Sequence, residues 1–154
     1  MFDRIVADIA NFNIRGGESV AKWGLLAFSI KKKELDSSCS FLSTYITALQ
    51  KAKKNIVSAR EEDASLQAVL DAVFDKKKLS SAQSLKEVQS TLQEHIDRKT
   101  KELERLHKKI GSIGAKKIKR GMHILTHGHS NLIEEILIEA KKTTDFSLSV
   151  TDTI

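Results

Sequence analysis

Two short stretches of this sequence combine glycine with residues that can bind an anion. The first is Arg15-Gly16-Gly17, directly before an amphipathic segment, and the second is Thr126-His127-Gly128-His129-Ser130. Glycine lets a ligand approach the backbone, a helix start has unpaired N–H groups, and arginine can hold a phosphate with two hydrogen bonds. We predict phosphate binding at Arg15, Gly16, Gly17, Thr126, His127, Gly128, His129 and Ser130. Taken alone, an Arg-Gly-Gly stretch is more often a structural turn.

The histidines and the cysteine could do other chemistry, which their surroundings do not favour. His123, His127 and His129 lack the spacing of a common zinc site, and no cysteine or acidic residue stands beside them. The single cysteine, Cys39, lies between two serines in a predicted amphipathic helix, where a small buried residue is more common than a nucleophile. We therefore predict no metal and no cofactor.

The composition is that of a soluble globular protein. The 154 residues suffice for one domain, or for one domain and part of another, and the longest apolar run, Trp23–Ile30, is far shorter than the ~20 residues of a membrane span. One cysteine and no visible secretory signal favour the cytoplasm. The net charge of +6 comes from scattered lysine clusters with few aromatic residues, so we expect no direct nucleic-acid binding and no membrane binding.

Apolar residues recur at helical spacing from Phe2 onward and predict a helical N-terminal domain over residues 1–120. Lys76–Ser81 is the clearest loop, and Asp36-Ser37-Ser38 has the residue types that begin a helix. The strongest repeat predicts one long helix between Ala82 and Arg120, followed by a left-handed glycine at Gly121. A free coiled coil is the alternative. The apolar positions of this repeat are Leu85, Val88, Leu92, Ile96, Leu103, Leu106, Ile110 and Ile113.

Residues 121–154 contain two strand patterns with a turn and a helical pattern between them. Met122–Leu125 is a short apolar run, Thr126–Ser130 is a polar turn, Asn131–Lys142 has helical spacing, and Phe146–Val150 alternates with period two. Together they predict one β-α-β unit. Ligands gather where a strand is followed by a helix, so the turn is the predicted centre of the site. Two parallel strands leave apolar surface uncovered, and we expect a second copy to bury it or the segment to be disordered.

Several motifs resemble one known family. The stretch Ile14–Ala21 is similar to the early Arg-Gly-Ala-Gly stretch of archaeal ribose-1,5-bisphosphate isomerases. Ile110–Ile118, Ile124–Ser130 and Val150–Thr153 resemble the family that joins these isomerases, the methylthioribose-1-phosphate isomerases and the α, β and δ regulatory subunits of translation initiation factor 2B. The resemblance extends over nearly the whole chain. It implies a helical N-terminal domain followed by the opening of a Rossmann-like domain, and so a mainly α protein.

The departures from the isomerases imply a protein that is not an enzyme. The isomerases have a catalytic cysteine where this chain has Gly128, their catalytic aspartate lies further on than residue 154, and their Arg-Pro-Thr stretch has no counterpart near Leu35-Asp36-Ser37. A glycine or alanine at residue 128 resembles the initiation-factor subunits.

The resemblance thus implies a non-catalytic protein that associates with itself and with translation initiation factor subunits, and that senses a sugar phosphate or nucleotide phosphate. The rival is an aldose–ketose isomerase of sugar phosphates, or a remnant that binds such a ligand without converting it.

Overall fold

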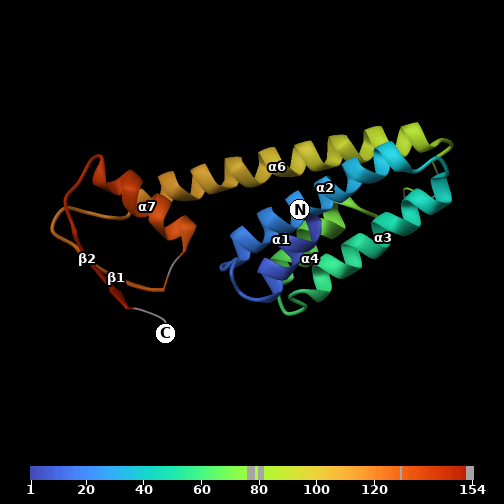
Figure 1. Cartoon of the computed structure of the whole chain (residues 1–154). Helices are drawn as coiled ribbons and strands as arrows, with labels where there is room; N and C mark the ends of the chain where they lie inside the picture. The colour runs from blue at the N-terminus through green and yellow to red at the C-terminus, as the bar shows by residue number, and fades with distance from the viewer. Residues whose placement is uncertain (76–78, 80–81, 129, 152–154) are drawn as a thin grey trace. The chain divides into compact units, whose positions relative to one another are not determined.

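The computed structural model describes residues 1–75, 79, 82–128 and 130–151. The described elements are, in chain order, α1 (Phe2–Ala10), α2 (Gly17–Ser38), α3 (Leu42–Ser58), α4 (Ala64–Val73), α6 (Leu85–Ala115), β1 (His123–His127), α7 (Asn131–Lys141) and β2 (Ser147–Thr151) (Figure 1). A mainly helical chain that ends in a β-α-β unit is the predicted fold class, which is confirmed. None of the described helices is both long enough and apolar enough to cross a membrane.

The chain forms two compact units, Met1–Lys101 and Glu102–Ile154, and α6 contributes to both. Unit 1 contains α1 to α4 and the first part of α6, and unit 2 contains the rest. The predicted domain boundary after residue 120 stays a prediction. The predicted loop at Lys76–Ser81 lies outside the described residues except for Leu79, which is buried.

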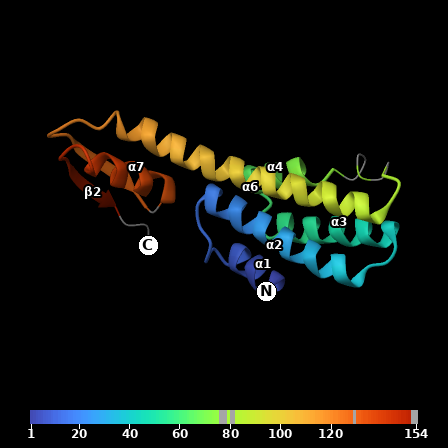
Figure 2. The ribbon, with the colours of Figure 1, turned by 90° about the horizontal axis from the view of Figure 1, so that it is seen from above.

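Unit 1 has a closed apolar core. Helix α2 packs against α1, α3 and α4, and Figure 2 shows α1 beside α2. The close approach of α2 to α4 depends on Gly24, because a Cβ there would lie 2.2 Å from Cδ1 of Leu66. The largest fully buried side chains are Ile9, Val20, Phe28, Tyr45, Leu49, Ile56, Leu66, Leu70, Val73, Val88 and Leu92.

A polar network at the end of α2 corrects the helix start predicted at Asp36-Ser37-Ser38, because α2 continues to Ser38. The Asp36 carboxylate accepts hydrogen bonds from Lys32 (2.7 Å) and from the hydroxyl of the buried Tyr45 (2.6 Å). The Ser38 hydroxyl donates to the Glu34 carbonyl at 2.8 Å, which is the bond of a serine inside a helix rather than of a cap. Helix α3 instead begins after Phe41, without a side-chain cap bond.

The same extension of α2 corrects the prediction for Cys39. This residue lies outside the helices, at the C-terminal cap of α2, and its N–H donates to the Leu35 carbonyl. Its side chain is intermediate in exposure rather than buried.

The longest described helix, α6, lies within the range predicted for it, between Ala82 and Arg120. It ends at Ala115, so Gly121 does not cap it. Gly121 has the expected positive φ of 80° but makes a turn before β1, where its N–H donates to the Asp145 carbonyl at 2.9 Å. The predicted role of Gly121 at the helix end is therefore wrong.

Unit 2 contains the predicted β-α-β unit. Strands β1 and β2 are parallel, with His123 paired to Ser147 and His127 to Thr151. Both strands are shifted toward the C-terminus relative to the prediction, so Thr126 and His127 belong to β1 and not to the turn. Helix α7 packs against α6, where a Cβ on Gly114 would lie 2.6 Å from Cδ1 of Ile136.

Candidate functional site

The first predicted stretch, Arg15-Gly16-Gly17, connects α1 to α2. Gly16 is the N-cap of α2 with φ 79°, and its carbonyl accepts from the Val20 N–H at 3.0 Å. The exposed Arg15 donates its Nε–H to the Phe12 carbonyl at 3.0 Å. A Cβ on Gly17 would lie 3.1 Å from Oγ of Ser65, so glycine lets the start of α2 lie against α4. Each glycine therefore has a structural reason.

A buried arginine, Arg60, fixes this connection, and the sequence analysis did not find it. Its two terminal nitrogens donate to the carbonyls of Ile14 (3.1 Å) and Ile9 (2.6 Å), and its guanidinium lies 4.1 Å from the centre of the Phe12 ring. Only 8% of the residue is exposed. A cation at the carbonyl end of α1 is electrostatically favourable. The positive charge of Arg60 therefore stabilises the backbone carbonyls of the connection.

Carboxylates also lie near the start of α2. Glu18 in its first turn pairs with Lys22 at 2.6 Å, and Oδ2 of Asp63 lies 3.8 Å from the position of a Cβ on Gly17. The other oxygen of Asp63 accepts from the Leu66 N–H and caps α4. An anion at Gly16 and Gly17 would meet these negative charges, so its binding would depend on Arg15. Phosphate binding at this connection stays a prediction.

The second predicted stretch lies at the end of β1 and the start of α7. Nδ1 of His127 is 2.6 Å from Oγ1 of Thr151, and the Gly128 N–H donates to the Thr151 carbonyl at 3.0 Å. Gly128 has a φ of 64°, which favours glycine. Ser130 is the exposed N-cap of α7, and its hydroxyl makes no capping bond. His129 lies outside the described residues.

The two predicted stretches belong to different units: Arg15, Gly16 and Gly17 to unit 1, and Thr126 to Ser130 to unit 2. A joint phosphate site therefore stays a prediction, and so does a separate site at either stretch.

His123 and His127 of β1 share one face of the small sheet with Leu125 and with the hydroxyl groups of β2. Nδ1 of His123 lies 2.7 Å from Oγ of Ser147, and its Nε2 lies 3.0 Å from Oγ of Ser149. His127 and Thr151 continue the row on the same face, since residues two apart in a strand point the same way. In the part of the chain that the structure describes, no three His, Cys, Asp or Glu residues gather as a metal site requires.

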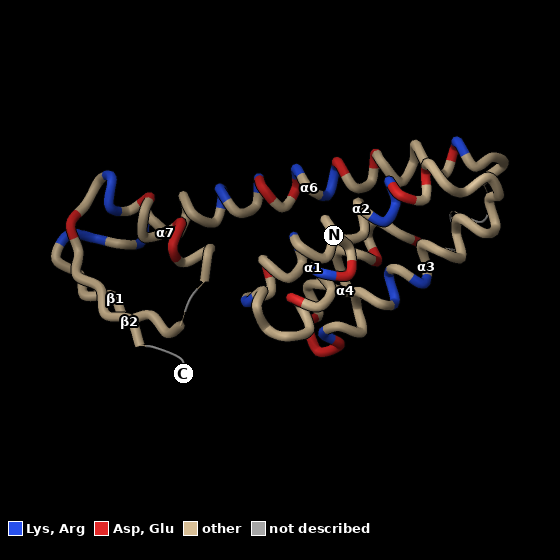
Figure 3. The backbone as a smooth tube through the Cα atoms, viewed as in Figure 1, with Lys and Arg blue, Asp and Glu red and all other residues tan. Residues whose placement is uncertain are grey.

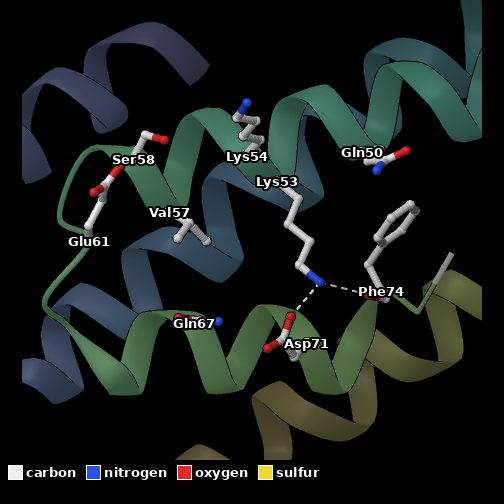
Figure 4. A pocket seen from close by; sticks show the side chains of 9 residues that line it. All are labelled: Gln50, Lys53, Lys54, Val57, Ser58, Glu61, Gln67, Asp71 and Phe74. Atoms are coloured by element: carbon white, nitrogen blue, oxygen red, sulfur yellow. Dashed lines mark hydrogen bonds and ion pairs between the residues drawn. The ribbon is translucent and has the colours of Figure 1, made fainter.

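A pocket of about 540 Å³, lined by both polar and apolar side chains, lies between α3 and α4, away from the predicted residues (Figure 4). Lys53 crosses it, donating to the Phe74 carbonyl at 2.9 Å and pairing with Asp71 at 2.6 Å. The pocket thus already contains an ion pair at its centre. Its lining residues are Gln50, Lys53, Lys54, Val57, Ser58, Glu61, Gln67, Asp71 and Phe74.

Residues 15–154, which are nearly the whole chain, match the initiation factor 2 subunit family. This chain belongs to the initiation factor 2 subunit family. The resemblance predicted from the motifs at Ile14–Ala21, Ile110–Ile118 and Ile124–Ser130 is thereby confirmed.

Both branches of the resemblance are represented among similar proteins. A putative translation initiation factor eIF-2B subunit 2-like protein of Pyrococcus furiosus is 27% identical over 139 residues, covering 90% of this chain and 45% of the relative. The structure of translation initiation factor eIF-2B from Pyrococcus horikoshii is similar with a TM-score of 0.77, 21% identity and coverage of 97% and 49%. For 5-methylthioribose 1-phosphate isomerase from the same organism the values are 0.74, 13%, and 97% and 51%.

The similar structures establish the fold of this member of the initiation factor 2 subunit family, but they do not choose between its two branches. The two solved structures share its fold, and they include both a translation factor and an isomerase. The chain spans about half the length of the relatives that it matches. The choice between the two branches therefore depends on its own residues.

Proposed function

We propose that this family member is a non-catalytic protein, related to the regulatory subunits of initiation factor 2B, that acts in the cytoplasm by binding other protein chains. The observation that carries the proposal is that large apolar side chains are exposed on both faces of the small sheet of the β-α-β unit. Leu125 is 70% exposed, Val150 59% and Leu148 43%. Leu125 points to one face of the sheet, and Leu148 and Val150 point to the other.

Covering these exposed apolar side chains would lower the free energy. Parallel sheets are normally covered on both faces, and removing apolar surface from water stabilises by about 25 cal/mol per Å². A second copy of this chain or an initiation factor subunit would supply that cover. Family membership supports a partner of the second kind.

The backbone at residue 128 supports a non-catalytic protein. Moving hydrogen between the adjacent carbons of an aldose requires positioned acid and base groups. Where the resembling isomerases have a catalytic cysteine, Gly128 has no side chain and adopts a left-handed backbone conformation. Arg15, Gly16 and Gly17, and residues Thr126 to Ser130 at the junction of β1 and α7, are the groups that we propose for sensing a sugar phosphate or nucleotide phosphate.

The association is tested by isolating native complexes through a tag on the full chain. We expect copies of the chain or initiation factor subunits to be recovered with the wild type, and recovery to fall for Leu125→Asn combined with Val150→Asn. Phe41→Asn is the matched control, because Phe41 is 74% exposed but belongs to unit 1. A wild-type chain that is isolated alone and sediments as a monomer would contradict the proposal.

The isomerase rival requires its own assay. The purified chain is incubated with ribose-1,5-bisphosphate and with methylthioribose-1-phosphate, and the ketose is measured against a control without protein. We expect no ketose. Turnover of either substrate would overturn the non-catalytic assignment.

A further inference from the structure

We propose that the second part of α6 and the turn that follows it, residues 105–120, bind an acidic amphipathic helix of a partner protein. This surface is called the basic ridge surface below. The proposal rests on the proposed function of protein association and adds the chemistry of the partner. It is separate from the two sheet faces that expose Leu125 and Val150.

One side of α6 in this region is already occupied. Gly111 and Gly114 lie so close to α7 that a Cβ on either would be within 2.8 Å of Glu135 or Ile136. His107, one turn earlier, lies 3.9 Å from Glu135. These three positions therefore form the side of α6 that packs within unit 2.

The next side of α6 exposes apolar residues. Leu106, Ile110 and Ile113 each precede a position of the packed side by one residue, which places them about 100° around the helix from it. They are 37%, 42% and 51% exposed. Three large aliphatic side chains at helical spacing thus form an uncovered ridge that rises about 10 Å along the helix axis.

A basic ridge borders the apolar one. Arg105 precedes Leu106 by one residue, and Lys109 precedes Ile110 by one residue. Lys116 follows directly after the end of α6. Residues 105–120 contain seven Lys or Arg and no Asp or Glu, and all seven are exposed. None of the seven forms an ion pair with another residue that the structure describes. They are Arg105, Lys108, Lys109, Lys116, Lys117, Lys119 and Arg120 (Figure 3).

The first part of α6 shows that this charge pattern is not a general property of the helix. Residues 85–104 carry four basic and five acidic residues. The basic ones are Lys86, Arg98, Lys99 and Lys101, and the acidic ones are Glu87, Glu94, Asp97, Glu102 and Glu104. Across α6 and the turn that follows it, the excess of positive charge is confined to residues 105–120, the stretch that contains the exposed apolar ridge.

An apolar ridge beside a basic ridge selects for one kind of partner. A helix with apolar residues at i, i+4 and i+7 would cover Leu106, Ile110 and Ile113, and Asp or Glu on its flank would face Arg105, Lys109 and Lys116. Complementary charge sets the orientation and speeds the encounter, and salt weakens it. A nucleic acid would pair with the positive charges of the lysines, but it offers no apolar surface that could cover the apolar ridge.

The probe for the test is a synthetic helical peptide with leucines at i, i+4 and i+7 and glutamates on one flank. Its binding to the full chain is followed by fluorescence anisotropy and by backbone amide shifts. We expect saturable binding with shifts at residues 105–120, weakened roughly tenfold by Lys109→Glu with Lys116→Glu, as loss of close charge pairs predicts. Lys86→Glu with Lys101→Glu is the matched control on the first part of α6 and should leave the affinity unchanged.

Three outcomes would overturn the inference. One is equal affinity for a scrambled peptide of the same composition. Another is binding of phosphatidylserine vesicles or duplex DNA without binding of the peptide. The third is a set of amide shifts that lies outside residues 105–120 instead of within them.

Applying Lys109→Glu with Lys116→Glu to the native complexes separates this inference from the proposed function. Recovery that survives charge reversal but is lost with Leu125→Asn and Val150→Asn contradicts only the basic ridge surface. A wild-type chain without any partner contradicts the proposed function.

Discussion

The two parts of α6 have the same apolar spacing and opposite surroundings. In unit 1, Val88, Leu92 and Ile96 are at most 4% exposed, whereas Leu106, Ile110 and Ile113 in unit 2 are 37% to 51% exposed. The difference extends to the units as wholes. Ala140 is the one buried apolar side chain in the described part of unit 2, while unit 1 contains all the others. Helical periodicity thus identifies a face that must be covered but not what covers it.

The largest effect should separate these two parts directly. We expect Leu92→Ala to lower the free energy of unfolding by about 2–5 kcal/mol, because it leaves a cavity in a closed core. Ile110→Ala, on the exposed ridge, should cost less than about 1 kcal/mol. Urea denaturation of both variants measures the difference. Equal losses would show that Ile110 is covered within the chain.

Two glycines test the same contrast between the closed core of unit 1 and the open packing of unit 2, because an added methyl group overpacks each site. Gly24→Ala should cost about 1–3 kcal/mol, because the fully buried Leu66 cannot move away from the new methyl group. Gly114→Ala should cost less, since Ile136 is only partly buried and can move away. The helix preference of alanine, up to about 1 kcal/mol, favours both variants equally. Thermal unfolding of the two variants ranks them. A larger loss at Gly114 would contradict the open packing of unit 2.

How much the sequence predicts follows from where the partners of a residue lie. The spacing of Val88 and Leu92 predicts α6, because the signal is contained within the helix. Asp36 does not predict its own role, because its partner Tyr45 lies on the next helix. Arg60 was missed for the same reason: its partners are carbonyls 46 and 51 residues away.

The strand limits failed in a related way. His123, Leu125 and His127 continue one alternation, but the bonds that keep Thr126 and His127 in β1 come from Thr151. The sequence does place Thr126 to Ser130 at the junction of β1 and α7, and the ligand that would bind there remains a prediction.

The polar network of unit 1 gives a pH-dependent prediction. Burial, and then the hydrogen bond and charge of Asp36, raise the pKa of Tyr45 above its usual value. The folded chain therefore keeps the phenol proton when the unfolded chain loses it, so this stabilisation is complete below about pH 10 and is lost as the pH rises above it. Tyr45→Phe should cost about 1 kcal/mol at neutral pH and flatten the decline above pH 10. Parallel pH curves for both proteins would contradict the network.

A last pair of variants concerns residue 128 and the connection that follows it. Gly128→Cys should destabilise by about 1–2 kcal/mol through its left-handed backbone and restore no isomerase activity. Ser130→Cys is the control at an extended backbone position in the same connection and should be nearly neutral. Thermal unfolding and the ketose assay are applied to both. Activity in Gly128→Cys would favour the isomerase branch.

Association through unit 2 is tested most directly by hydrogen exchange, measured on the purified chain and on the native complex. We predict slower amide exchange in the complex along β1 and β2, where Leu125 and Val150 are exposed, with unchanged exchange in α2 to α4. Binding of a partner to the open surface would produce this difference because it limits local opening there. Identical exchange of β1 and β2 in both samples would contradict it.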